Sequence, residues 1–358
     1  MFYQFLDMTL QKELIDTKNC IENLSNGIFY QIFDYLDGYD IYKAFSNLNN
    51  RRFENLLIDP SFLMKIQISS TSEFDYHYKQ FINLNKHHIL SFHFNNESIQ
   101  NEIMKPCIIE SFDHLESIVL NPISTWKLFV LFFYLASLPR LSSLTIYVND
   151  YHDDLRGIFH LIFCLRVLKY LKFKLLSSNI LNIDTRMPSN QPFSSIKYLV
   201  INAGCAHNQL MNLLLYIPQL SHLSCDYLIK SNNNIKSEMM IKLNDLIHLT
   251  VVINDIDFNE FEEFLLKLCS QLQILNVKIH SSDKSYLNAN RWEQLISQKM
   301  TSLNKFFFSY TVIIHGNFNI TSHPLLNDFT SSFWINRKWI FKLLAHDDEL
   351  IYSIRPYS

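Results

Sequence analysis

A nine-residue pattern of apolar positions recurs along most of the chain. Apolar side chains occupy positions 1, 4, 7 and 9 of each copy, as in LPRLSSLTI at 138–146 and LNDLIHLTV at 243–251. Other copies begin at residues 112, 165, 193, 217, 269 and 300, and a further copy at 86–94 has Lys86 at position 1. Leucine fills 13 of the 18 sites at positions 4 and 7. This recurrence indicates a repeated structural unit.

The spacing of the copies predicts strand–helix units. Their fourth residues lie at 89, 115, 141, 168, 196, 220, 246, 272 and 303, in steps of 24 to 31 residues. Each copy ends with alternating apolar residues, which predicts a short strand. Helical stripes lie between copies, over 155–163, 209–217, 260–268 and 291–298. Because one such unit cannot bury its own apolar faces, the pattern predicts an α/β solenoid with parallel strands on the concave face and helices on the convex face.

A different pattern, of three short helices, occupies the front of the chain. Ser25 is expected to cap the first helix. The apolar stripe of that helix comprises Ile28, Phe29, Ile32, Phe33 and Leu36. Gly38 is expected to end it in a left-handed conformation, and Asp40 to cap the second helix. A third helix is expected from about Asn49 to Asp59 and Pro60.

These three helices are too small to bury all their apolar side chains. Within about 35 residues a hydrophobic core seldom stands alone. Two interpretations follow: the helices bind a partner through apolar side chains left exposed, or they form the N-terminal cap that a repeat array needs.

Composition and charge narrow the classes of partner. Hydrophobic residues make up 48% of the chain and charged residues 18%, which allows a large core. The net charge is −3 and the pI about 6.5, so we expect neither a nucleic acid nor a membrane as partner. The pair Arg51 and Arg52 is expected to be a solvated helix end.

The cysteines and apolar runs bear on the compartment. The six cysteines lie far apart and form no CxxC, so neither a metal site nor a disulfide framework is expected. The first 17 residues have no basic region typical of a signal peptide, and the longest apolar run, at 128–136, is far shorter than the roughly 20 residues of a membrane helix. We therefore expect a protein of a reducing compartment, the cytoplasm or the nucleus.

Motifs for catalysis are not found. The five glycines form no phosphate-binding loop or nucleophile elbow, and the zinc pattern HExxH is absent. Two clusters, YHDD at 151–154 and HDD at 346–348, place a histidine beside two carboxylates, but neighbouring loop residues do not converge on one point. We expect no catalytic, cofactor-binding or metal-binding residues, and no enzyme.

The front helices resemble an F-box, a motif that begins with Leu-Pro, continues through an apolar helix to Tyr-Leu, and ends in an apolar third helix. The residues that occupy its characteristic places are Leu24, Ile28, Ile32, Phe33, Tyr35, Leu36, Asp40, Ile41, Phe45 and Phe53. Ser25 stands where proline is usual, Gly27 where an acidic residue is usual, and Phe53 where tryptophan is common. Serine can begin a helix as proline does, so the helix is expected to form in spite of these departures. The property that they affect is the affinity for the adaptor.

The repeated units resemble a leucine-rich-repeat array of the helix-backed kind. The two resemblances divide the chain into 1–20, a lead-in; 21–60, the F-box module; 61–85, a linker; 86–310, the solenoid; and 311–358, a C-terminal capping segment of one or two strands. The pairing of an F-box with leucine-rich repeats is known.

Together the resemblances imply a non-catalytic receptor subunit of a Skp/cullin/F-box ubiquitin ligase. The F-box would bind the Skp-type adaptor of the cullin complex, and the repeats would bind a target protein whose contact residues are unknown. The implied adaptor contacts are Leu24, Ser25, Ile28, Ile32 and Leu36. The alternative is an interaction scaffold without a ligase role, in which the front helices only cap the array.

Overall fold

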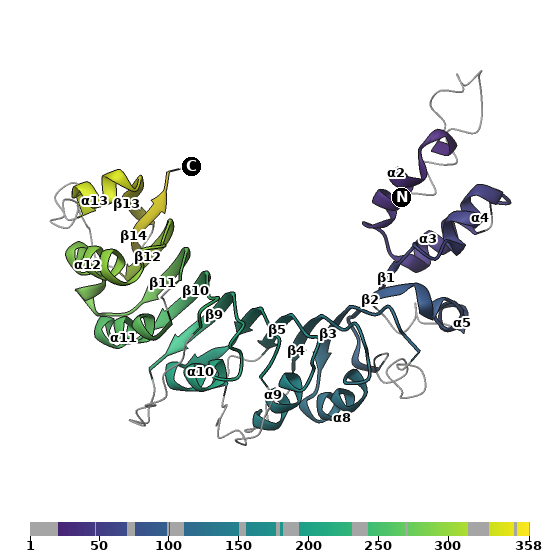
Figure 1. The fold of residues 1–358 in the computed structure, drawn as a ribbon, viewed down its shortest axis with the longest axis horizontal. Helices are drawn as coiled ribbons and strands as arrows, with labels where there is room; N and C mark the ends of the chain where they lie inside the picture. Colours follow the sequence, from purple (N-terminus) through teal and green to yellow (C-terminus); the bar gives the residue numbers. More distant parts are fainter. Residues whose placement is uncertain are drawn as a thin grey trace.

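Among the residues that the structure describes, fourteen strands form one curved, mostly parallel sheet with helices along its convex side (Figure 1). The structure is a computed structural model. It describes residues 21–46, 48–69, 76–98, 100, 111–149, 155–176, 180–181, 193–230, 243–268, 271–313, 329–346 and 349–357. The chain is therefore of the mixed α/β class.

The sheet grows strand by strand along the sequence. Its parallel strands, in order, are β1 (Met64–Ile68), β2 (Ile89–Phe94), β3 (Ser117–Ile123), β4 (Ser143–Val148), β5 (Tyr170–Leu175), β7 (Tyr198–Asn202), β9 (His222–Ile229), β10 (His248–Asn254), β11 (Ile274–His280) and β12 (Lys305–Ile313). The short strands β6 (Ile180–Leu181) and β8 (Gly204–Ala206) lie outside this order, with β8 paired to β6 and β9. At the far end, β14 (Glu349–Pro356) pairs antiparallel with β12, and β13 (Trp339–His346) pairs with β14.

The register of these strands matches the nine-residue pattern. Position 7 of each copy stands beside position 7 of the next in a continuous row: Phe92, Ile118, Leu144, Leu171, Leu199, Leu223, Leu249, Leu275 and Phe306. Every member of this row, and every residue at position 4, is at most 2% exposed. The predicted strands are thus confirmed, and their burial explains the leucine-rich pattern.

Helices cover the convex side of this row (Figure 1). They are α5 (Tyr76–Asn85), α8 (Thr125–Leu135), α9 (Arg156–Phe163), α10 (His207–Leu214), α11 (Phe258–Leu268) and α12 (Ala289–Lys299). Trp292 on α12 shows how the layers meet: its ring lies 5.1 Å from Phe258 and 5.1 Å from Phe306 on β12. Its indole N–H donates to the Tyr286 carbonyl at 2.8 Å, so this fully buried ring keeps its hydrogen bond.

The chain outside the repeated copies extends both ends of the sheet. Residues 61–85, expected as a linker, contain β1 and α5, and β1 continues the parallel sheet beside β2. The segment expected to cap the C-terminal end contains α13 (Ser332–Asn336) and the β13–β14 hairpin. Trp334 and Trp339 there lie 6.3 Å and 5.6 Å from Phe306, ring to ring. These aromatic side chains cover the last buried ring of the row.

Three helices precede β1, namely α2 (Asn26–Phe33), α3 (Gly38–Phe45) and α4 (Arg51–Ile58). They project from the N-terminal end of the sheet (Figure 1). The predicted end of the first helix is wrong: Asp37, not Asp40, caps α3, and Gly38 is the first residue of that helix. The reason is tertiary, because a Cβ on Gly38 would lie 2.8 Å from Met64 Cβ on β1.

Asp37 joins α3 to the edge strand β1. One carboxylate oxygen accepts from the backbone N–H of Tyr39 at 2.8 Å, and the other accepts from that of Gln67 at 2.6 Å. Burial raises the pKa of Asp37, and the backbone donors act against that rise. One side chain therefore caps a helix and satisfies a donor on the edge of the sheet, which fixes the three helices to the array.

Replacing either of the two glycines in the front helices by alanine is expected to change the free energy of unfolding, in opposite directions. Gly38→Ala would drive Cβ into Met64 and Ile66, so we expect the free energy of unfolding to fall by about 1–3 kcal/mol. A Cβ on Gly27 meets only Ser25 Oγ, at 3.9 Å, so Gly27→Ala should raise it by about 0.5–1 kcal/mol. Urea unfolding of both variants tests the close packing of α3 on β1, and equal effects would contradict it.

Candidate functional site

The three N-terminal helices pack around phenylalanine rings. Phe29 on α2 and Phe45 on α3 lie 5.2 Å and 5.0 Å from Phe53 on α4, centroid to centroid. Phe33 joins them at 5.3 Å from Phe45. Phe29, Phe33 and Phe53 are at most 4% exposed. Because α2 buries Phe29 and Phe33 on one side, Ile28 and Ile32 face away from the core.

Ile28, Ile32 and Leu36 form an exposed apolar row, called here the α2 stripe. Ile28 and Ile32 lie one helical turn apart on α2, and Leu36 lies in the turn that follows. They are 42%, 37% and 36% exposed, and Tyr35 beside them is 90% exposed. Burying one large apolar side chain is worth about 1.5–3 kcal/mol, so this stripe favours association with a partner.

The other two predicted adaptor contacts lie at the start of α2. Ser25 is the N-cap, as predicted, and its Oγ accepts from the Ile28 N–H at 3.4 Å. Its side chain is exposed, whereas Leu24 is partly buried against the core. The structure thus brings Ser25, Ile28, Ile32 and Leu36 to the surface of one helix and turns part of Leu24 inward.

Arg52 on α4 holds the chain just before α2. Its guanidinium donates to the main-chain oxygens of Glu22 and Leu24, and to Asn26 Oδ1 at 2.8 Å. It also lies 5.4 Å from the centre of the Phe29 ring. The expectation of a solvated helix end is therefore wrong for Arg52, which orients the segment that carries Leu24 and Ser25. Sequence reasoning missed it because its partners lie 26 to 30 residues earlier.

A second surface runs across the concave face of the sheet. There, position 6 of successive copies aligns Tyr170, Tyr198, His222 and His248. The Tyr198 and His222 rings stack at 4.3 Å, and His222 lies 5.4 Å from His248. Burial lowers the pKa of both histidines, and that of His222 is lowered further by His248. Both imidazoles are therefore neutral at pH 7, which suits ring stacking.

Lysines adjoin this row of rings. Lys172 Nζ and Lys174 Nζ lie 5.7 Å and 5.8 Å from the centre of the Tyr147 ring. Such cation–π contacts hold ammonium groups near an aromatic face. We call the set made up of Tyr147, Tyr170, Lys172, Lys174, Tyr198, His222 and His248 the central concave patch.

The described residues show no arrangement typical of catalysis. They include no group of three or more His, Cys, Asp or Glu side chains that could hold a metal ion. Burial raises the pKa of Cys205 to about 12 and that of Cys225 well above its usual value, so both remain protonated thiols. The YHDD cluster lies outside the described residues, as do Asp347 and Asp348 of the second cluster.

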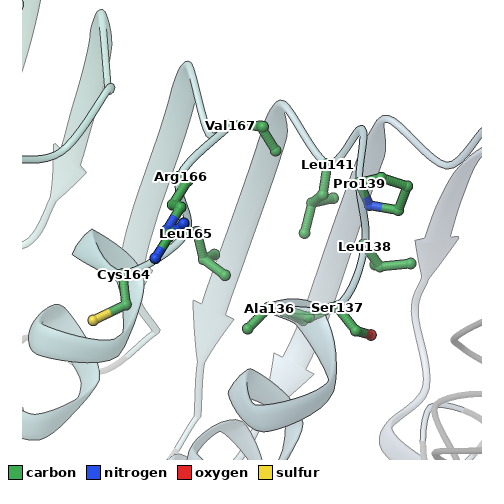
Figure 2. Close-up of a pocket in the computed structure, with 10 residues that line it drawn as sticks. Ala136, Ser137, Leu138, Pro139, Leu141, Cys164, Leu165, Arg166 and Val167 are labelled. Atoms are coloured by element: carbon green, nitrogen blue, oxygen red, sulfur yellow. The ribbon is translucent and has the colours of Figure 1, made fainter.

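A pocket of about 460 Å³ lies between the loops that lead into β4 and β5 (Figure 2). Leu138, Pro139 and Leu141 line one side, and Leu165 and Val167 the other. Arg166 is the one charged residue among those that line the pocket. The pocket is a gap between consecutive loops.

Comparison with known proteins adds no identity. No model of a known protein family matches the chain, and no curated protein matches it. Among the described residues, no helix is both long enough and apolar enough to cross a membrane.

The concave histidines predict a pH dependence of stability. Their pKa values are lowered in the folded protein, so below about pH 6.5 the unfolded chain binds protons that the folded chain does not. The neutral histidines contribute their whole share of the unfolding free energy above pH 6.5. That contribution is lost as the pH falls through their pKa values in the folded protein, which are lower. We expect the unfolding free energy to fall between pH 7.5 and 5.5, and to fall less in His222→Gln/His248→Gln.

Urea unfolding of both proteins at each pH measures that difference. His93 and His207, whose pKa values are also lowered, remain in both proteins and cancel in the comparison. An identical pH slope in the double variant would show that His222 and His248 carry no such linkage.

Proposed function

We propose that this chain is a receptor subunit of a Skp/cullin/F-box ubiquitin ligase. In this proposal α2–α4 are the F-box, which binds the Skp-type adaptor, and the curved sheet with its helices is a leucine-rich-repeat-like solenoid that binds a target protein. The subunit itself breaks no bond. It acts by holding the target near the transferring machinery, which raises the effective concentration of the two.

The observation that carries the proposal is the exposed α2 stripe. A helix that only capped the array would be expected to turn its apolar side chains inward, whereas Ile28, Ile32 and Leu36 are more than a third exposed. The stripe coincides with the places at which the resemblance to an F-box implies adaptor contacts. Arg52 and Ser25 order the start of the same helix, so the surface is offered in a defined conformation.

The form of the array supports the second half of the proposal. In-register parallel strands on the concave side and helices on the convex side are the geometry that stacked strand–helix repeats adopt (Figure 1). Its sheet presents a broad row of side chains that the core does not use. Such a surface suits recognition of an extended segment or a convex partner.

One observation favours the alternative, an interaction scaffold with no ligase role. Asp37 and Gly38 bind α3 closely to β1, as a structural cap would require. Under this alternative the front helices protect the sheet edge and bind no adaptor. The two proposals therefore differ in one measurable property, adaptor capture by the folded protein.

The test is co-purification of the full-length protein with a Skp-type adaptor and a cullin. Leu36→Asp places a charge in the α2 stripe, and we expect it to weaken adaptor binding by at least about tenfold, since burying one such side chain is worth 1.5–3 kcal/mol. The fold should persist because Leu36 is 36% exposed.

Leu84→Asp is the matched control, because Leu84 on α5 is 72% exposed and lies outside the stripe. It should bind the adaptor as the unaltered protein does. Failure of the folded, unaltered protein to capture an adaptor would overturn the ligase proposal and favour the scaffold.

A further inference from the structure

The central concave patch has an excess of positive charge. Three adjacent strands, β4, β5 and β7, contain no acidic residue, whereas β5 contributes Lys172 and Lys174. Lys169 and Lys197 stand at the entrance to β5 and β7 and are exposed. None of these four lysines has an ion-pair partner among the described residues. Within the described part of the chain no carboxylate neutralises their charge, which can act on a bound partner.

Among the described strands next to the patch, β9 contributes a carboxylate, that of Asp226. The register places Tyr147, Lys174 and Asn202 side by side on successive strands, and Asp226 on β9 follows Cys225, the partner of Ile201. Asn202 stands between the lysine and the carboxylate, and its amide donates to Asp226 Oδ2. Since neighbouring strands lie about 4.8 Å apart, Asp226 stands roughly 10 Å from Lys174 and leaves its charge unpaired.

The rings beside the lysines form a continuous row of aromatic side chains across the strands. Tyr170, Tyr198, His222 and His248 occupy four successive strands in register, and Tyr198 is 42% exposed. From β4 to β10 the patch crosses four strand spacings, about 19 Å, which an extended segment of about six residues spans. Aromatic surfaces of this kind are enriched where proteins bind one another.

We propose that the central concave patch binds an acidic, aromatic-containing peptide segment of the target protein. The carboxylates of the segment would pair with Lys172 and Lys174, and its aromatic side chains would pack on the row from Tyr170 to His248. This inference rests on the proposed function, since it names the chemistry of the target that the receptor holds. The patch carries no arginine, and the chain has a net charge of −3, which favours a peptide over a nucleic acid.

The test uses a fluorescein-labelled peptide of alternating glutamate and tyrosine, about eight residues long, and the full-length protein. Fluorescence anisotropy should show binding that weakens with added salt. Lys172→Gln/Lys174→Gln should bind about tenfold more weakly. Lys267→Gln/Lys299→Gln, with the same charge change on the convex helices α11 and α12, should bind as the unaltered protein does. Asp226→Asn should bind more tightly, because it removes the opposing charge on β9.

Three results would overturn the inference: no binding by the folded protein, equal weakening by the convex pair, or tighter binding of oligouridylate than of the peptide. The unfolding midpoint of each variant shows whether it folds. Adaptor capture is measured on the same preparations, and the α2 stripe is untouched in all of them. A protein that captures adaptor but not peptide refutes only this inference, whereas one that binds peptide but no adaptor refutes only the ligase proposal.

Discussion

One buried row of side chains, stacked in register across parallel strands, determines the rest of this structure. Leu171, Leu199 and their counterparts lie between the sheet and its helices, where a slip of one residue would turn the row toward solvent. The same register decides which side chains stand together on the opposite face. Tyr198 meets His222 because Leu199 meets Leu223. The surface offered to a partner is thus set by the requirements of the core.

Much of this could be predicted from the sequence, because burial repeats. A site that must be apolar in every unit leaves a periodic signal, and all nine copies of the pattern became strands in register. Four of the helices between them, α9, α10, α11 and α12, followed from their own stripes, whereas α8 was not predicted. Ser25 could be assigned as a cap since its partner, the Ile28 N–H, lies three residues away. The apolar residues of the first helix could be located for a similar reason, although the phenylalanines of α3 and α4 decide that Phe29 and Phe33 face inward and leave the α2 stripe exposed.

The remaining features depend on contacts between distant segments. The start of α3 depends on β1, some 30 residues later. Met64 and Ile66 on this strand leave no room for a side chain at Gly38, and the backbone N–H of Gln67 donates a hydrogen bond to the Asp37 carboxylate. Arg52 finds its acceptors before α2, where no local pattern indicates them. β1 alternates apolar and polar like the other strands, but it lacks the leucine frame. The concave patch left no periodic signal either, since burial does not constrain those positions.

Both ends of the sheet are closed, and this has a consequence for how such a chain can change in length. At one end Asp37 takes up a donor of the edge strand, and at the other the β13–β14 hairpin reverses the chain. The terminal strands are not copies of the repeat, so a unit appended outside either closure would lack the repeat neighbour on which it stacks. Duplication or loss of units is therefore tolerated only in the interior, in steps of about 26 residues. Each such event would move the front helices relative to the hairpin while leaving both closures intact, so evolution can adjust the reach of the molecule without redesigning its ends.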